Sequence, residues 1–290
     1  MKVIRSIDNM KQTVRDYQNE KKQIGFVPTM GFLHAGHLQL MKEAKKENDV
    51  VVASIFVNPL QFGPNEDFEK YPRDEQKDSL LAENVGVDVL FIPTADEMYP
   101  NPMLIQMALK ERVDVLCGRS RPGHFDGVLT VVTKLFHIIH PDKAYFGLKD
   151  AQQVAVIDAL IRDLNFPIEL VGLPTIREVD GLAKSSRNVN LTEQERKEAT
   201  WIYQGLQTGQ QLIRNGEQNP TKIINGVTKT LEQKVSGKID YVELLSYPSL
   251  EPVTSINQQV ILATAVYFKQ ARLIDNLLLD ENGKIITRYN

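Results

Sequence analysis

The feature that most constrains the fold is an alternation of short apolar runs with segments of helical periodicity over the first 175 residues. Five runs rich in β-branched residues suit strands buried on both faces of a parallel sheet; they are 24–28, 50–56, 88–92, 144–146 and 168–171. Apolar residues spaced three and four apart form a helical stripe over 128–139 and another over 154–164. This pattern predicts an α/β fold with a Rossmann-like doubly wound parallel sheet, whose ligands bind beyond the carboxyl ends of the strands.

The rhythm changes after residue 175. The pattern Thr192-Glu-Gln-Glu195 is a capping box and predicts the start of a helix that runs to Asn215. A second helix is expected from the break at 216–220 to Val235, and three strand-like segments follow at 239–245, 260–268 and 271–279. We therefore expect two domains, residues 1–175 and a smaller, lid-like α+β domain at 176–290.

Composition excludes several classes of function. A net charge of −3 and a pI of about 6.0 disfavour a nucleic-acid binder, which would need a basic stripe. Cys117 is the only cysteine, so neither an intramolecular disulfide nor a four-thiolate zinc site can form. The start of the chain is polar and is expected to be helical. With such a start and no apolar run of about 18 residues, the chain is expected to be cytoplasmic, with no membrane partner.

Two histidines occupy the turn between the first expected strand and the helix after it. His34 and His37 stand in a segment where Gly31 and Gly36 let the backbone approach a ligand. The helix that follows offers its N-terminus to a phosphate, and the imidazoles can donate hydrogen bonds to phosphate oxygens. A zinc pair or two ordinary turn histidines are the alternatives; the strand before, the helix after and the two glycines favour a nucleotide site.

Three later segments carry further polar residues. Lys184-Ser-Ser-Arg187 lies in a polar stretch and suits a mobile loop that closes on a triphosphate. Lys149 follows another strand and could contact phosphates, and Asp150 could accept from a ribose hydroxyl. Gln61 and Gln153 suit a substrate bearing hydroxyls and a carboxylate, because an amide both donates and accepts hydrogen bonds. Arg121 is either a cation near the substrate or part of a plain turn.

The His-x-Gly-His pattern resembles the signature of an adenylyl-transferring superfamily that includes class I aminoacyl-tRNA synthetases. Taken together, six segments resemble one family within it, the pantothenate synthetases (pantoate–β-alanine ligases). They span nearly the whole chain, at 28–37, 54–73, 121–136, 145–153, 180–188 and 272–276.

The resemblance implies an ATP-dependent ligase that joins pantoate to β-alanine through a pantoyl-adenylate, with release of AMP and pyrophosphate. It implies Mg²⁺ on the ATP phosphates, no tightly bound organic cofactor, and a homodimer. His37 is the nominal acid, His34 and Lys149 are expected to act with it, and Gln61 and Gln153 hold pantoate, with Gln61 also near β-alanine. The expected ATP contacts are Met30, Gly31, Phe32, Leu33, His34, Ala35, Gly36, His37, Gly147, Leu148, Lys149, Asp150, Ile176, Lys184, Ser185, Ser186 and Arg187.

Three positions depart from the usual pattern of the family: Leu148 stands for Glu, Ala151 for Tyr and Lys184 for Met. Each departure could change the KM for ATP. The alternatives are an adenylyltransferase acting on a phosphate ester, a tRNA-charging enzyme, and a nucleotide sensor without activity. Because a sensor would be expected to have lost His34, His37 or Lys149, and all are present, the ligase is favoured.

Overall fold

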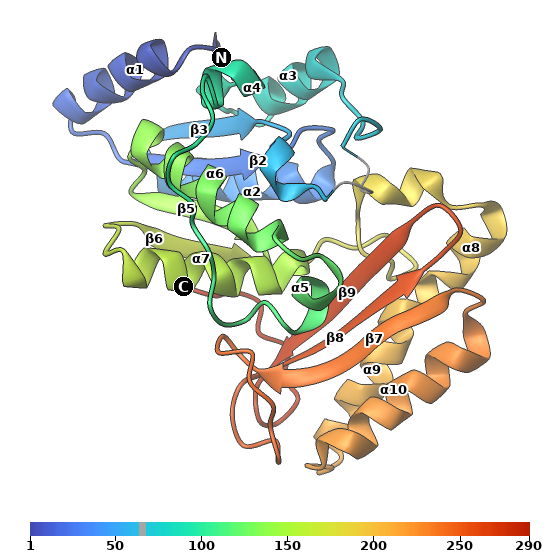
Figure 1. Ribbon diagram of the computed structural model, residues 1–290. Coiled ribbons are helices and arrows are strands. Elements are labelled where there is room, and N and C mark those ends of the chain that lie inside the picture. Colours follow the sequence, from blue (N-terminus) through green and yellow to red (C-terminus); the bar gives the residue numbers. More distant parts are fainter. Residues whose placement is uncertain (64–67) are drawn as a thin grey trace.

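The computed structural model describes residues 1–63 and 68–290; the last four residues before Phe68, within the segment 54–73, lie outside this description. A parallel sheet of six strands forms the larger part, in the order β1-β4-β3-β2-β5-β6 (Figure 1). The strands are β1 (Lys2–Ile4), β2 (Ile24–Thr29), β3 (Val50–Ile55), β4 (Val89–Phe91), β5 (Lys143–Gly147) and β6 (Glu169–Leu173). All five strand pairs are parallel, as the apolar runs predicted.

Helices cover both faces of this sheet. Side chains alternate along a strand, so Phe26 packs with α1 (Ile7–Asn19), α6 (His124–Ile139) and α7 (Ala151–Asp163), while Val27 packs with α2 (Ala35–Glu47) and α3 (Glu75–Asn84). The short helices α4 (Ala95–Met98) and α5 (Leu116–Ser120) lie in the connection from β4 to α6. The prediction of a doubly wound α/β sheet is confirmed.

The remaining chain forms a smaller α+β part, also as predicted. Helices α8 (Glu193–Glu198), α9 (Thr200–Arg214) and α10 (Pro220–Lys234) precede β7 (Lys238–Ser246), β8 (Val260–Tyr267) and β9 (Arg272–Leu279). The three strands form an antiparallel sheet in the order β7-β8-β9. One face of the sheet packs on α9 and α10, and the other joins the core of the parallel-sheet part (Figure 1).

Two elements differ from the sequence expectation. The start of the chain, expected to be helical, contains β1 before α1, because a strand of three residues is too short to show a period. The helix expected from Thr192 to Asn215 is divided at Ala199, where the Thr200 hydroxyl donates to the Lys197 carbonyl. In the described part of the chain, no helix has the length and apolarity needed to cross a membrane.

The topology brings two chemically important turns together. β2 pairs with β3 on one side and β5 on the other, so the strand order reverses between β2 and β5. Residues 30–37, hereafter the histidine turn, follow β2, and residues 147–150, hereafter the lysine turn, follow β5. Both therefore lie at the carboxyl edge of the sheet, at the switch point where ligands bind in folds of this type.

Candidate active site

The two histidines of the histidine turn cap helix α2. The Nδ1 atom of His34, the N-cap residue, accepts a hydrogen bond from the Gly36 N–H at 3.1 Å. The Nδ1 atom of His37 accepts from the His34 N–H at 3.3 Å, which completes a reciprocal capping arrangement. The rings stack with centroids 4.0 Å apart. Both imidazoles are thus fixed by the backbone of the helix that they begin.

Burial sets the charge of each imidazole, and the capping contacts set which nitrogen carries the proton. Burial lowers the pKa of His34 to about 4, and the nearby Lys149 ammonium contributes. Burial also lowers the pKa of His37 to about 3, with help from His34 and Lys149. Both rings are therefore neutral at pH 7. Because each Nδ1 accepts a backbone N–H, the remaining proton lies on Nε2, which leaves one N–H donor per ring.

Asp78 on α3 bonds the backbone of the histidine turn. Its carboxylate accepts from the Phe32 N–H and the Leu33 N–H, both at 2.7 Å, and the residue is 1% exposed. Phe32 has φ of +49°, a left-handed conformation that is costly for a residue with a side chain. A Cβ on Gly31, whose φ is +82°, would lie 3.0 Å from this carboxylate. Asp78 thus stabilises a strained turn, a role that its sequence position does not reveal.

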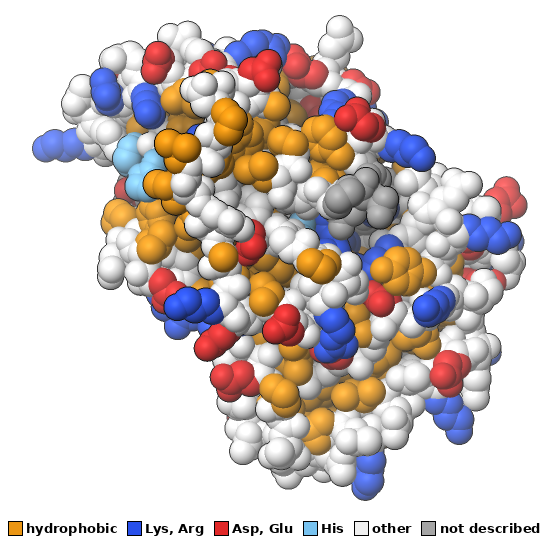
Figure 2. All heavy atoms as spheres, in the orientation of Figure 1, with side chains coloured by type: hydrophobic (Ala, Val, Ile, Leu, Met, Phe, Trp, Pro, Cys, Tyr) orange, Lys and Arg blue, Asp and Glu red, His pale blue; other side chains and the backbone are white. Residues whose placement is uncertain are grey.

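A cavity of about 240 Å³, hereafter the histidine cavity, lies beside the two imidazoles. It brings together most of the expected ATP contacts, namely Met30, His34, Gly36, His37, Gly147, Lys149, Asp150, Ile176 and Lys184–Arg187. Basic side chains gather in the hollow between the two parts of the molecule (Figure 2). The Lys149 ammonium has no hydrogen-bond or ion-pair partner among the described residues, whereas the Lys184 ammonium contacts Glu178 at 2.9 Å. The site can therefore offer an unpaired cation and two neutral N–H donors to an anion.

Five of the expected ATP contacts do not line the histidine cavity: Gly31, Phe32, Leu33, Ala35 and Leu148. The N–H groups of Phe32 and Leu33 are used by Asp78. Leu148 is 3% exposed and belongs to the core, so its side chain points away from the histidine cavity. Ala151 is buried as well. Both side chains are thus buried at the lysine turn.

Gln61 and Gln153 both line the histidine cavity. The Nε2 atom of Gln61 lies 3.1 Å from the Met30 sulfur, and its Oε1 accepts from Asn58 at 3.3 Å. Asn58 also donates to the Gly127 carbonyl and accepts from the Tyr99 hydroxyl. Gln152, the neighbour of Gln153, instead bonds only backbone groups of 112–118. The structure therefore assigns different surroundings to two adjacent glutamines.

Arg121 lies at the wall of the histidine cavity rather than in a turn remote from it. One guanidinium nitrogen is 2.9 Å from the Nε2 atom of His124, and the Nδ1 atom of His124 is 2.8 Å from the Gln61 carbonyl. A carbonyl can only accept, so His124 donates from Nδ1 and accepts from Arg121. The sequence left two roles open for Arg121, a cation near the substrate or part of a plain turn, and did not predict its link to the Gln61 backbone through His124.

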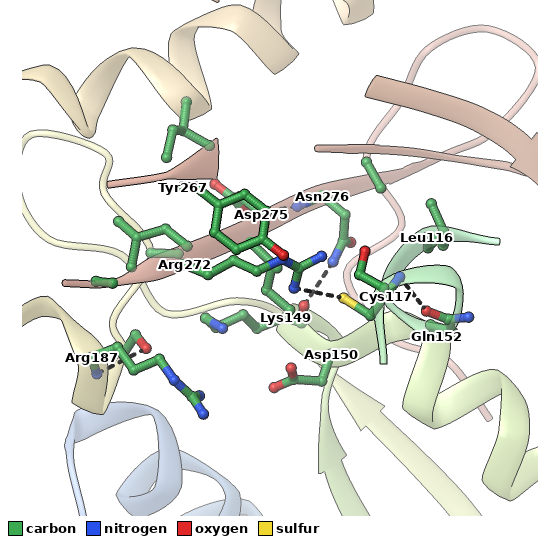
Figure 3. Close-up of a pocket in the computed structure, with 18 of the residues that line it drawn as sticks. Leu116, Cys117, Lys149, Asp150, Gln152, Arg187, Tyr267, Arg272, Asp275 and Asn276 are labelled. Atoms are coloured by element: carbon green, nitrogen blue, oxygen red, sulfur yellow. Dashed lines mark hydrogen bonds between the residues drawn. The ribbon is translucent and has the colours of Figure 1, made fainter. Parts of the chain in front are cut away.

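A second cavity of about 530 Å³, hereafter the β9 cavity, adjoins the first and shares Lys149, Asp150 and Gln153 with it. Arg272 and Asn276 from β9 and Cys117 from α5 contribute to its wall (Figure 3). Arg272 pairs with Asp240 at 2.7 Å and lies 3.5 Å from the Cys117 sulfur. The ligand space therefore extends from the parallel sheet to the antiparallel one.

The donor set for a metal ion is sparse. The described residues contain no group of three or more His, Cys, Asp or Glu side chains arranged to hold a metal. Asp150 is the one carboxylate among the described residues that line the histidine cavity. Asp78 does not line it, and both of its carboxylate oxygens accept from backbone N–H groups. Mg²⁺ commonly binds through one or two carboxylates plus substrate phosphates and water. These residues therefore fit an ion that arrives on a nucleotide.

A family model for pantoate-beta-alanine ligase matches residues 2–278. The chain belongs to this family. It is 59% identical to a pantothenate synthetase of Geobacillus sp. (strain WCH70) over 97% of this chain and 99% of that protein. It is 58% identical to the pantothenate synthetase of Bacillus subtilis (strain 168), with 97% and 98% covered.

Solved structures agree with these sequence relatives. The pantothenate synthetase of Thermus thermophilus superposes with a TM-score of 0.90 at 41% identity, covering 96% of this chain and 99% of that one. A pantoate-beta-alanine ligase from Francisella tularensis, complexed with beta-gamma ATP and beta-alanine, gives 0.77 at 38% identity, covering 96% and 97%. The predicted family, and with it an ATP-dependent ligase of pantoate and β-alanine, is confirmed.

Proposed function

We propose that this chain makes pantothenate in two steps through a pantoyl-adenylate, with the histidine cavity as the place where ATP is attacked. The observation that carries the proposal is the pair of neutral imidazoles, whose Nε2–H groups, like the Lys149 ammonium beside them, have no hydrogen-bond partner among the described residues. Such donors stabilise negative charge that moves between oxygens in the transition state.

In the first step, a carboxylate oxygen of pantoate attacks the α-phosphorus of ATP, and the bond to the departing pyrophosphate breaks. A carboxylate has no proton to lose, so the histidines need not act as bases. His34, His37 and Lys149 instead compensate the charge that builds on the phosphate oxygens. Gln61 and Gln153 hold pantoate in the orientation that brings its carboxylate to the phosphorus.

In the second step, the amine of β-alanine attacks the acyl carbon, the bond to the AMP oxygen breaks, and a proton passes to solvent. Gln61 lies next to the incoming amine in this proposal. The proposed ATP contacts are the residues that line the histidine cavity, together with Gly31, Phe32, Leu33, Ala35 and Leu148 of the two turns. Lys184–Arg187 close on the triphosphate, and Lys184 exchanges Glu178 for a phosphate oxygen.

The proposal includes Mg²⁺ bound to the ATP phosphates, where it would supply charge neutralisation, and no tightly bound organic cofactor. It treats residues 1–175 and 176–290 as two domains, the second a lid over the first. It places the enzyme in the cytoplasm, without nucleic-acid or membrane partners, as a homodimer joined through the first domain. The exposed apolar run Met103–Ile105 would suit such an interface.

Product analysis with ATP, Mg²⁺ and pantoate, with and without β-alanine, tests the chemistry. We expect AMP, pyrophosphate and pantothenate in equal amounts when both organic substrates are present. Pantoyl-adenylate bound to the protein should be detectable by mass spectrometry when β-alanine is omitted. ATP binding without formation of AMP or pantothenate would overturn the proposal in favour of a nucleotide sensor.

A further inference from the structure

Two neighbouring residues of β9 bond the two turns that surround the phosphates in the proposed function. The side-chain amide of Asn276 donates to the carbonyl of Leu148 at 3.0 Å and to that of Lys149 at 2.9 Å. Figure 3 shows Asn276 beside Lys149. Asn276 is 7% exposed, so this contact is largely shielded from water. Both N–H groups of the amide are thus used to hold the backbone of the lysine turn.

Asp275 contacts the hairpin that carries the second proposed phosphate loop, Lys184–Arg187. Its carboxylate accepts two hydrogen bonds from Arg177, at 2.6 and 3.0 Å, and is 3% exposed. The Arg177 guanidinium also lies over the Tyr203 ring, 3.7 Å from its centre. The backbone of Arg177 forms an antiparallel β-bridge with Ala183, the residue directly before Lys184–Arg187. Asp275 therefore fixes the base of the hairpin that carries the second phosphate loop.

The two contacts share one rigid support. Strand β9 pairs with β8 along its whole length, and Asp275 and Asn276 lie opposite Thr264 and Ala263. Successive side chains of a strand point to opposite faces, so adjacent residues can reach two separate loops. A displacement of β9 would move the lysine turn and the hairpin of Arg177 together.

We propose that Asp275 and Asn276 are positioning residues that set the distance between the two phosphate-binding loops and so determine the affinity for ATP. The proposal rests on the proposed function, because it takes those loops to be the ATP contacts. Neither residue bonds Gln61, which is held by Asn58 and Met30 in the parallel-sheet part. Gln153, the other residue proposed to hold pantoate, stands on α7 just after the lysine turn, so affinity for pantoate should change much less than affinity for ATP.

The main variant is Asn276→Ala, which removes both donors without adding bulk. We expect the Kd and KM for ATP to rise about tenfold, as the loss of two neutral hydrogen bonds allows, while the Kd for pantoate stays within about twofold. ATP should also raise the melting temperature of Asn276→Ala less than that of the unaltered protein, since ligand stabilisation follows affinity. Asn276→Asp, which places an acceptor against the two carbonyls, should have a larger effect in the same direction.

Thr264→Val is the matched control. Thr264 is fully buried opposite Asp275, and its hydroxyl bonds only the Tyr241 carbonyl within the sheet. This variant should lower the melting temperature and leave both substrate affinities unchanged. Unaltered ATP affinity in a folded Asn276→Ala protein would overturn the proposal. So would a loss of ATP affinity in Asn276→Ala that is matched by its loss of pantoate affinity, or by the loss of ATP affinity in Thr264→Val.

The measurements separate this proposal from the proposed function. If the unaltered protein forms no pantothenate from ATP, pantoate and β-alanine, the proposed function is wrong, and calorimetric ATP binding still tests the positioning role. If the unaltered protein is active and Asn276→Ala binds ATP normally, only the positioning role is wrong.

Discussion

Replacement of Asp78 by asparagine would remove half of the support beneath the histidine turn. The carboxylate accepts two N–H bonds of 2.7 Å, whereas an asparagine can accept one and must turn its NH₂ group toward the other N–H. A hydrogen bond to a charged group contributes roughly 1.5–3 kcal/mol. Since the left-handed Phe32 already strains the turn, we expect a loss of about 2 kcal/mol in the stability of its active conformation.

If that loss is expressed fully in the transition state, kcat/KM for ATP falls about 30-fold, at 1.4 kcal/mol per factor of ten. AMP release under steady-state conditions measures the effect, and calorimetry gives the melting temperature. Asp74→Ala is the control on the same helix, because Asp74 caps α3 through the Lys77 N–H and does not bond the histidine turn. Normal kcat/KM in Asp78→Asn, or an equal fall in Asp74→Ala, would refute the reasoning.

Four further outcomes follow from the geometry of the site. His37→Gln should lower kcat by roughly 100-fold, the effect of losing one preorganised donor; AMP release within a few-fold of normal would disprove the role. Because the pKa values of His34 and His37 are about 4 and 3, kcat/KM for ATP should show no histidine titration between pH 6 and 8. Stability supplied by these neutral rings above pH 6.5 should be lost as pH falls from 6.5 toward 4, because the unfolded histidines take up protons first; thermal melts of a His34→Asn variant, less sensitive to pH, would check this. Lys184→Met should raise the KM for ATP several-fold and Glu178→Gln should lower it, with both effects reduced at high salt; opposite shifts in titrations with ATP would contradict the ion-pair exchange.

The sequence predicted most of the architecture because its signals are local. Apolar runs and helical stripes extend over several consecutive residues, and the glycines and histidines of the histidine turn are close together in the chain. The residues proposed to contact ATP could be named because the segments that carry them resemble those of a known family. β1 was missed because three residues carry no period.

The supports of the site depend on contacts between distant segments. Asp78 lies 46 residues after Phe32, on a helix whose apolar residues show little one-sided pattern, so nothing in its neighbourhood predicts burial. The resemblance implies an ATP contact at Leu148 as part of the run Gly147–Asp150, and the tight turn at Leu148–Asp150 directs its side chain into the core. Adjacent residues of a turn face different surroundings, and only the packed structure distinguishes them.

The segment Arg272–Asn276 shows what such contacts add. Its resemblance to the family named the segment without giving its residues a role. In the structure, Arg272 pairs with Asp240, Asp275 holds Arg177, and Asn276 holds the lysine turn. Three polar side chains of one strand thus bond three separate segments, two of which carry the residues proposed to contact ATP. A strand in the smaller part can therefore control the geometry of the proposed phosphate site, whose imidazoles belong to the larger part.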